Sequence, residues 1–216
     1  MSAPRPNPDT DGRPPTTIVF DLGNVLIGWD PRALYRKLFA EQPEQVDWFL
    51  ENVCTSAWNA EQDRGRRFSD AVVALAAQHP PQLHAAIRAY HERWVEMLTG
   101  EITGSVELLL ELHARGTPLY ALTNWNQETF AHARERYPWL ARFRGIVVSG
   151  EERCVKPEPQ IYHTLLARYG LQAADCVFID DSPANVRAAR EVGMHALQFS
   201  DPAQLRADLK ALGFAL

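Results

Sequence analysis

The sequence predicts an α/β protein with a doubly wound parallel sheet and an inserted α-helical segment. Five short runs of β-branched and aromatic residues are spread over the chain, and helical patterns separate them. Strands that alternate with helices form parallel sheets joined by right-handed crossovers. Residues 33–98, between the first and second runs, carry helical periodicity only, so we interpret them as an insertion.

Size and composition restrict the possible functions. The 216 residues suit one domain, or one core domain with a sizeable insertion. A net charge of -5 does not favour nucleic-acid binding, and no apolar stretch is long enough to cross a membrane. The three cysteines show neither metal spacing nor a disulfide framework, which suggests a reducing compartment. We therefore expect a cytoplasmic protein without a nucleic-acid or membrane partner; the sequence does not indicate an oligomeric state.

The first strand ends in a candidate catalytic carboxylate. Residues 1–15 are rich in Pro, Asp, Asn and Gly, and we predict a disordered tail there. Thr17 to Phe20 is a run typical of a buried strand, and Asp21 and a Gly23-Asn24 turn follow it. An Asp in this position points into the crevice where open α/β sheets bind ligands, although it would also suit a loop cap.

The inserted segment begins at Asp30 and Pro31, which predict a helix with Asp30 as N-cap and Pro31 at the first helical position. Apolar residues then recur at helical spacing as far as Leu98, and no strand pattern appears. The expected division of the chain is an α/β core of residues 16–32 and 100–216 and a helical insertion of residues 33–99.

The other four strands lie after the insertion. Their predicted ranges are residues 118–122, 146–148, 176–179 and 195–199. Ser182 and Pro183 predict the start of the helix that follows the third of these, with Ser182 as its N-cap.

Polar side chains follow four of the five predicted strands. Each is a weak signal alone, because a Thr at a strand end usually caps a loop and a Lys before Pro is usually solvated. The carboxyl ends of parallel strands meet at one edge of the sheet, so we expect these side chains to form one site. They are Asp21, Thr123 with Asn124, Lys156, and Asp180 with Asp181.

The paired carboxylates suggest a metal. Asp180 and Asp181, placed near Asp21, would repel it by about 4 kcal/mol per close pair at intermediate dielectric. Lys156 supplies one positive charge, and Mg²⁺, which prefers oxygen ligands, would supply two more. The two carboxylates could instead only cap the following helix. Ser182 is predicted to be that cap, so we favour a Mg²⁺ site.

These residue types suit phosphoryl transfer. Asp21 can attack phosphorus and form an aspartyl-phosphate that water then hydrolyses. Thr123 and Asn124 would donate hydrogen bonds to the transferred group, and Lys156 would neutralise its developing charge. Mg²⁺ would hold the nucleophile and the phosphoryl oxygens together.

Taken together, the motifs resemble those of the haloacid dehalogenase superfamily of hydrolases. The resemblance extends from Thr16 to Phe214 and implies a Rossmann-like core with a C1-type helical cap, residues 33–99, that closes over the active site. The matching motifs are Phe20-Asp21-Leu22-Gly23-Asn24-Val25-Leu26, Leu122-Thr123-Asn124, Lys156-Pro157-Glu158-Pro159-Gln160-Ile161-Tyr162 and Phe178-Ile179-Asp180-Asp181-Ser182-Pro183-Ala184-Asn185.

The Asp-Leu-Gly-Asn-Val form of the first motif is similar to a branch of bacterial sugar-phosphate phosphatases. That branch includes glucose-1-phosphatase-like enzymes and resembles the phosphatase domain of soluble epoxide hydrolase. The resemblance implies a Mg²⁺-dependent phosphatase that acts on a sugar phosphate or a similar small phosphorylated metabolite. The implied metal ligands are Asp21, the backbone carbonyl of Gly23, Asp180 and Asp181.

Gly23 departs from the family pattern. Most phosphatases of the family have an Asp at this position that protonates the leaving group, and such an acid typically contributes about 10²–10⁴-fold. Our hypothesis is that Asp30 or a bound water replaces it, although the N-cap interpretation of Asp30 is at least as well supported.

Two other functions remain open. A 2-haloacid dehalogenase would use the same nucleophile on carbon, without a metal, but those enzymes resemble an Asp-x-Tyr-Gly-Thr first motif and usually carry Ser-Asn in the last one. This chain has Gly23 and Asp180-Asp181 there, so we favour a phosphatase. A non-catalytic binding protein is the other alternative, and the presence of Asp21 and Lys156 argues against it.

Three further residues are weaker candidates. We expect Asn185 to support the loop of the last motif, although a surface helix residue is the simpler interpretation. Trp125 directly follows Thr123-Asn124 and is expected to line the substrate pocket. Arg64, in an Asp-Arg-Gly turn of the insertion, could reach a substrate or simply be solvated.

Overall fold

A computed structural model describes residues 14–216, and its centre is a five-stranded parallel sheet. The strand order is β5-β4-β1-β6-β7, with β1 in the middle and the later strands added outward on both sides. The strands are β1 (Thr17–Phe20), β4 (Leu119–Thr123), β5 (Gly145–Val148), β6 (Cys176–Asp180) and β7 (His195–Gln198). The predicted doubly wound fold is confirmed, and the first 13 residues of the predicted disordered tail lie outside the described residues.

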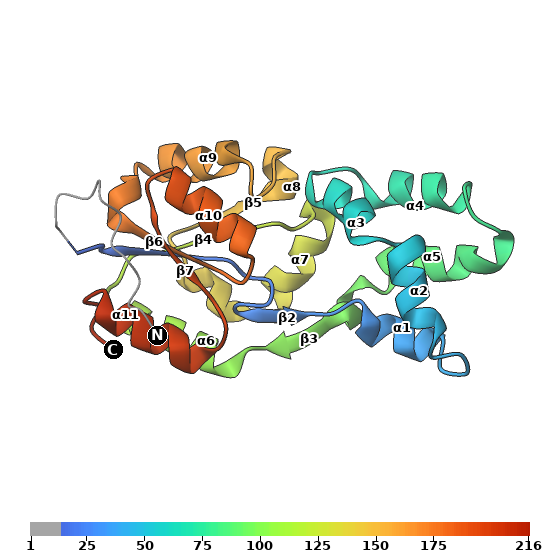
Figure 1. The fold of residues 1–216 in the computed structure, drawn as a ribbon, viewed down its shortest axis with the longest axis horizontal. Helices are drawn as coiled ribbons and strands as arrows, with labels where there is room; N and C mark the ends of the chain where they lie inside the picture. The colour runs from blue at the N-terminus through green and yellow to red at the C-terminus, as the bar shows by residue number, and fades with distance from the viewer. Residues whose placement is uncertain (1–13) are drawn as a thin grey trace.

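Helices cover both faces of the sheet (Figure 1). The alternation along β1 separates two cores: Ile18 and Phe20 belong to one apolar cluster, and Val19 belongs to the other. In Figure 1, α6 and α11 lie below the sheet and α9 and α10 above it. The helices and short helical turns of this part are α6 (Thr103–Ala114), α7 (Gln127–Arg136), η3 (Pro138–Arg142), α8 (Ser149–Glu152), α9 (Pro159–Tyr169), η4 (Ala173–Asp175), α10 (Pro183–Glu191) and α11 (Pro202–Ala211).

The helical insertion, residues 32–97, projects beyond one end of the sheet (Figure 1). Buried and partly buried aromatic side chains hold it together: the rings of Tyr35 and Phe49 are 4.7 Å apart, and those of Trp58 and Tyr90 are 5.0 Å apart. Its elements are α1 (Arg32–Leu38), α2 (Gln45–Asn52), α3 (Ser56–Asp63), α4 (Phe68–Ala76), η1 (Pro81–Leu83), α5 (His84–Glu92) and η2 (Trp94–Met97).

A two-stranded antiparallel ribbon joins the insertion to the core, and it corrects the prediction of an entirely helical segment up to Leu98. Its strands are β2 (Ile27–Trp29) and β3 (Leu98–Glu101), with Gly28 opposite Gly100. The residues of each strand find their hydrogen-bond partners about 70 positions away, so the local pattern does not reveal them. Both connections between the two parts of the molecule therefore run side by side (Figure 1).

Two helix starts differ from the prediction. Ser182 occupies the N-cap position of α10, but its side chain makes no capping hydrogen bond; its backbone N–H instead donates to Asp180 Oδ1 over 2.8 Å. The sequence analysis assumed that the side chain of Ser182 caps α10 and that Asp180 is not needed there. This assumption is wrong, because Asp180 accepts the hydrogen bond. At the start of α1, Pro31 is the N-cap residue and Asp30 Oδ1 accepts a hydrogen bond from the N–H of Arg32 over 2.9 Å.

Within residues 14–216, no helix combines the length and apolar character needed to cross a bilayer. The cysteines are all free and buried, in agreement with the absence of a disulfide framework in the sequence.

The packing of the insertion can be tested on one helix. Leu75 of α4 is 7% exposed and Val73 is 71% exposed. We expect Leu75→Ala to lower the free energy of unfolding by about 2–4 kcal/mol, because it removes buried apolar surface and leaves a cavity. Val73→Ala, the matched control, should change it by less than about 0.5 kcal/mol. Urea denaturation measures both, and equal losses would contradict the assigned packing.

Candidate active site

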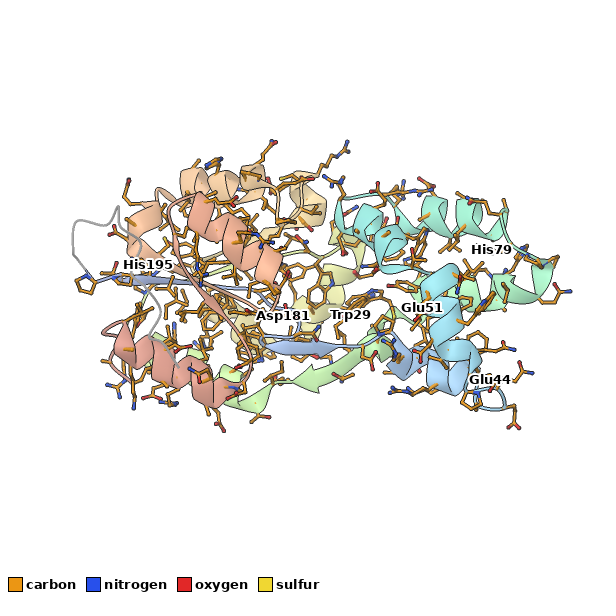
Figure 2. All side chains as sticks on the ribbon, viewed as in Figure 1. Trp29, Glu44, Glu51, His79, Asp181 and His195 are labelled. Atoms are coloured by element: carbon orange, nitrogen blue, oxygen red, sulfur yellow. The ribbon has the colours of Figure 1, made fainter. Side chains whose placement is uncertain are left out.

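The carboxyl ends of β1, β4 and β6 meet the helical insertion at a cavity of about 160 Å³. Figure 2 shows Trp29 and Asp181, which both line it, at the junction of the sheet and the insertion. Ligands of doubly wound folds bind at this edge, beside the central strand from which the sheet grows in both directions. The lining residues are Asp21, Gly23, Asn24, Trp29, Asn59, Asp63, Trp94, Asn124, Trp125 and Asp181.

Lys156 is the buried cation of the site. Its Nζ lies 2.8 Å from Asp21 Oδ1 and 2.6 Å from Asp180 Oδ2, and its side chain is 1% exposed. Burial alone would lower the pKa of Lys156, but the charges and hydrogen bonds of Asp21 and Asp180 hold that pKa above its usual value. The lysine is therefore charged at neutral pH and bridges the ends of β1 and β6.

Asp180 is held from several sides. Oδ1 accepts hydrogen bonds from Ser182 N–H and Asn185 Nδ2, and Oδ2 accepts from Lys156 and, over 3.1 Å, from the same Asn185 amide. Tyr162 in turn donates its hydroxyl to the backbone carbonyl of Asn185 over 3.0 Å. Asn185 thus contacts Asp180, whereas Asp181 is the carboxylate of the pair that lines the cavity.

Asn124 fixes the loop that carries Lys156. Its Nδ2 donates to the carbonyl of Lys156 over 2.9 Å, and its Oδ1 accepts from the N–H of Lys156 over 2.8 Å. Thr123, the last residue of β4, is buried, and its Oγ1 has no hydrogen-bond partner among the described residues. An unpartnered buried hydroxyl at the end of a central strand is suited to binding a polar ligand.

Three carboxylates offer a site for a cation. Oxygen atoms of Asp21, Asp180 and Asp181 all lie within 4.8 Å of one another. Burial raises the pKa of Asp21. The positive charge of Lys156 lowers this pKa, and the negative charges of Asp180 and Asp181 raise it further. One lysine therefore does not balance the three carboxylates, and a divalent cation with a preference for oxygen would. Gly23, whose backbone carbonyl is the expected fourth ligand, lines the same cavity.

Two of the weaker candidates lie away from this cavity among the described residues. Asp30 precedes the N-cap residue of α1, where its Oδ1 accepts a hydrogen bond from the N–H of Arg32 and its Oδ2 lies 3.7 Å from Arg36 Nη1, so its contacts are with the start of the helix. Arg64 forms an ion pair with Glu158, with Nη2 2.7 Å from Oε1, and so links the insertion to the loop after Lys156.

The structure adds Trp29, Asn59 and Asp63 to the residues that the sequence analysis selected. Trp29 and Trp94 form aromatic walls together with Trp125, the side chain expected in the substrate pocket, with 5.3 Å between the ring centres of Trp94 and Trp125. Asn59 and Asp63 of α3 bring polar groups of the insertion into the cavity. Asp63 belongs to the Asp-Arg-Gly turn noted in the sequence, so that turn could have pointed to Asp63 as a candidate site residue.

The fold and this site match a known family. A model of the haloacid dehalogenase-like hydrolase family matches residues 15–193, so the chain belongs to this family of hydrolases. The resemblance seen in the motifs is therefore confirmed.

The individual proteins that resemble this chain share a modest fraction of its sequence. The chain is 28% identical to the sesquiterpene phosphatase astK of Aspergillus oryzae over 90% of this chain and 94% of that protein. The structure is similar to the HAD family enzyme bt-2542 of Bacteroides thetaiotaomicron in complex with magnesium and inorganic phosphate, with a TM-score of 0.64, 22% identity, and coverage of 87% of this chain and 95% of that chain. It is also similar to the L-2-haloacid dehalogenase of Xanthobacter autotrophicus with chloropropionic acid covalently bound, with a TM-score of 0.60, 17% identity, and coverage of 94% and 85%.

Removal of the buried lysine tests the electrostatics of the site. The pKa of Asp21 is higher in the folded protein than in the unfolded chain. Ionised Asp21 therefore lowers the stability at high pH, and this destabilisation fades as the pH falls toward the pKa of Asp21 in the unfolded chain. Lys156 offsets the destabilisation. With EDTA present, Lys156→Met should lower the free energy of unfolding by about 3–5 kcal/mol at about pH 8 and by clearly less at about pH 5.

Lys37 provides the matched control. It is 58% exposed and pairs with Glu96 on the surface, so Lys37→Met should cost less than about 1 kcal/mol at either pH. Urea denaturation at the two pH values gives the comparison. A loss for Lys156→Met that does not change with pH would contradict the proposed charge balance.

Proposed function

We propose that this hydrolase is a Mg²⁺-dependent phosphatase that cleaves a small phosphate ester through an aspartyl-phosphate intermediate. The observation that carries the proposal is the set of three neighbouring carboxylates, two of which contact one buried lysine, with Asp21 and Asp181 lining the cavity. Such a site combines a nucleophile, a fixed positive charge and a place for a cation, which is what phosphoryl transfer requires.

Asp21 is the proposed nucleophile. Lys156 Nζ and the N–H of Leu22 both bond to its Oδ1, over 2.8 and 2.7 Å. These contacts fix the carboxylate and leave Oδ2 as the oxygen that attacks phosphorus. Lys156 then neutralises charge on the phosphoryl oxygens, and Thr123 Oγ1, which is unpartnered among the described residues, donates to them. Asn124 acts mainly by holding the Lys156 loop.

Mg²⁺ fits the donor set. Asp21, Asp181 and the carbonyl of Gly23 would hold it, and when bound it would stabilise the negative charge shared by nucleophile and phosphate. The oxygens of Asp180 already accept hydrogen bonds from Lys156, Asn185 and Ser182. We therefore propose that Asp180 contributes mainly its charge and the position of Lys156.

The substrate is proposed to be a sugar phosphate or a similar small phosphorylated metabolite. A cavity of about 160 Å³ is small, and Trp29, Trp94 and Trp125 would stack on an apolar face of the leaving group. The helical insertion would act as the cap that covers it. The relative astK is named a sesquiterpene phosphatase, and bt-2542 binds magnesium and inorganic phosphate, which supports phosphate as the group recognised. Free buried thiols suit an enzyme of a reducing cytoplasm.

The competing function is dehalogenation, since an L-2-haloacid dehalogenase has a similar fold. That likeness shows the fold alone. Attack on carbon would leave the third carboxylate, Asp181, without a task in the cavity. The excess of negative charge at the site therefore favours phosphate chemistry with a metal.

Hydrolysis of p-nitrophenyl phosphate tests the proposal. We expect turnover with Mg²⁺, its loss with EDTA and its recovery when Mg²⁺ is restored. The isosteric variant Asp21→Asn should lose about 10⁴-fold or more, because it removes the nucleophile. Absence of phosphatase activity, together with metal-independent halide release from 2-chloropropionate, would contradict the proposal.

The metal assignment has a separate readout that does not depend on turnover. Mg²⁺ should raise the melting temperature of the wild-type protein, because it binds the folded state only. Asp181→Asn should weaken Mg²⁺ binding by at least about tenfold, as followed by the shift in melting temperature with Mg²⁺ concentration. Asp175→Asn, at an exposed position before β6, is the control and should bind as wild type. Equal Mg²⁺ binding by the two variants would refute the role of Asp181.

A further inference from the structure

The proposed reaction lacks an obvious proton donor for the leaving group. The family places an acid at the position of Gly23, which has no side chain, and Asp30 lies outside the cavity. Among the residues that line the cavity, Asp21 and Asp181 are assigned to the nucleophile and the metal. Asp63 is the remaining carboxyl group there, and it comes from the last residue of α3 in the insertion.

The side chain of Asp63 is held by a directed chain of hydrogen bonds. Tyr90 donates its hydroxyl to Asn59 Oδ1 over 2.9 Å, and Asn59 Nδ2 donates to Asp63 Oδ2 over 2.9 Å. Because Tyr90 fixes the orientation of the amide, its NH₂ group faces Asp63. A carboxyl group with one oxygen held in this way keeps a defined direction toward the cavity.

The backbone around Asp63 is tied to the core. Ser149 Oγ donates to the carbonyl of Asp63 over 2.6 Å, and the same Oγ accepts from the N–H of Trp125 over 2.9 Å. Asn126 Nδ2 donates to the carbonyls of Gln62 and Arg66 over 2.7 and 3.0 Å. The end of α3 is thus fixed against the loop after β4, which places Asp63 at a constant position relative to the catalytic edge of the sheet.

Asp63 also has the right acidity. Burial raises its pKa to about 7, against the opposing effects of the Lys156 charge and a hydrogen bond from the backbone of Asn126. Tyr90, the other titratable side chain in this hydrogen-bonded chain, has a pKa raised well above its usual value and stays neutral. A carboxyl group that retains its proton near neutral pH can act as a general acid.

We propose that Asp63 is the general acid–base group of the reaction, in place of the acid that Gly23 lacks; this rests on the proposed phosphatase function. When Asp21 Oδ2 forms its bond to phosphorus, the bond from phosphorus to the leaving oxygen breaks, and that oxygen takes the proton of Asp63. The Asp63 carboxylate then accepts a proton from the water that attacks the aspartyl-phosphate. This second step breaks the bond between phosphorus and Asp21, releases phosphate and returns Asp63 to its protonated form.

A purely structural role for Asp63 makes a different prediction. If Asp63 only linked α3 to the core, its replacement would slow the hydrolysis of every substrate to a similar extent. An acid matters only when the leaving oxygen needs a proton. The dependence of the rate on the leaving group therefore separates the two roles.

The experiment compares p-nitrophenyl phosphate with phenyl phosphate, which have rings of the same kind but leaving groups of low and high basicity. For Asp63→Asn with Mg²⁺, we expect kcat/KM to fall less than about tenfold on p-nitrophenyl phosphate and about 10²-fold or more on phenyl phosphate. Asp70→Asn, at an exposed position in α4, is the control and should match wild type on both esters.

A second variant moves the acid. A Cβ atom built at Gly23 meets no other heavy atom within 4 Å, so the backbone there has room for the start of an Asp side chain. On phenyl phosphate, the double variant Gly23→Asp with Asp63→Asn should have a kcat/KM at least about tenfold higher than that of Asp63→Asn alone.

Equal losses on the two esters, or no loss on either, would overturn the assignment of Asp63. The assignment would also be overturned if Asp30→Asn lost much more activity on phenyl phosphate than on p-nitrophenyl phosphate while Asp63→Asn lost none. Asp30 would then be the acid. Failure of the phosphatase function itself is distinct, because the wild-type protein would then hydrolyse neither ester.

Discussion

The buried contact of Lys156 with Asp21 and Asp180 is the interaction on which the site depends. The two aspartates end neighbouring strands of the central sheet, and their side chains are nearly inaccessible to water. Without a cation between them, the charges would repel across a short distance in a medium of low dielectric. The lysine therefore permits the strand ends to approach, and the position of Asp21 is fixed before any substrate binds. Asn124 extends this control, because it holds both backbone polar groups of Lys156.

The core and the helical insertion supply different parts of the cavity. The core contributes the charged groups, Asp21 and Asp181, at the ends of β1 and β6, whereas the insertion contributes Asn59, Asp63 and Trp94. The antiparallel β2–β3 ribbon connects the two parts, and Asn126 and Ser149 of the core bond to the backbone at the end of α3. In the proposed reaction, the core would act on the phosphoryl group and the insertion would contact the leaving group, and the contacts at α3 hold the two parts together.

The sequence predicted the sheet and the core of the site because both are encoded locally. Each core strand is a short apolar run; Asp21, Thr123, Asp180 and Asp181 stand at the ends of such runs, and Lys156 lies in the connection that follows β5. The β2–β3 ribbon was missed because each strand is stabilised by a distant partner. Ser182 was assigned as a cap from its residue type, but its side chain makes no capping bond and Asp180 accepts the backbone N–H instead. Asp63 was passed over in favour of Arg64, since only the three-dimensional structure shows which side of that turn faces the cavity and which pairs with Glu158.

The central claim is that Asp21 becomes covalently bonded to phosphorus, and the stereochemical course at phosphorus tests it most directly. A phosphorothioate ester made chiral at phosphorus with ¹⁸O can be hydrolysed by the wild-type enzyme with Mg²⁺ in ¹⁷O-labelled water, and the configuration of the chiral thiophosphate product determined. Each in-line displacement inverts the configuration, so attack by Asp21 followed by attack of water predicts retention. Inversion would mean that water attacks the ester directly in a single displacement, and it would contradict the aspartyl-phosphate mechanism.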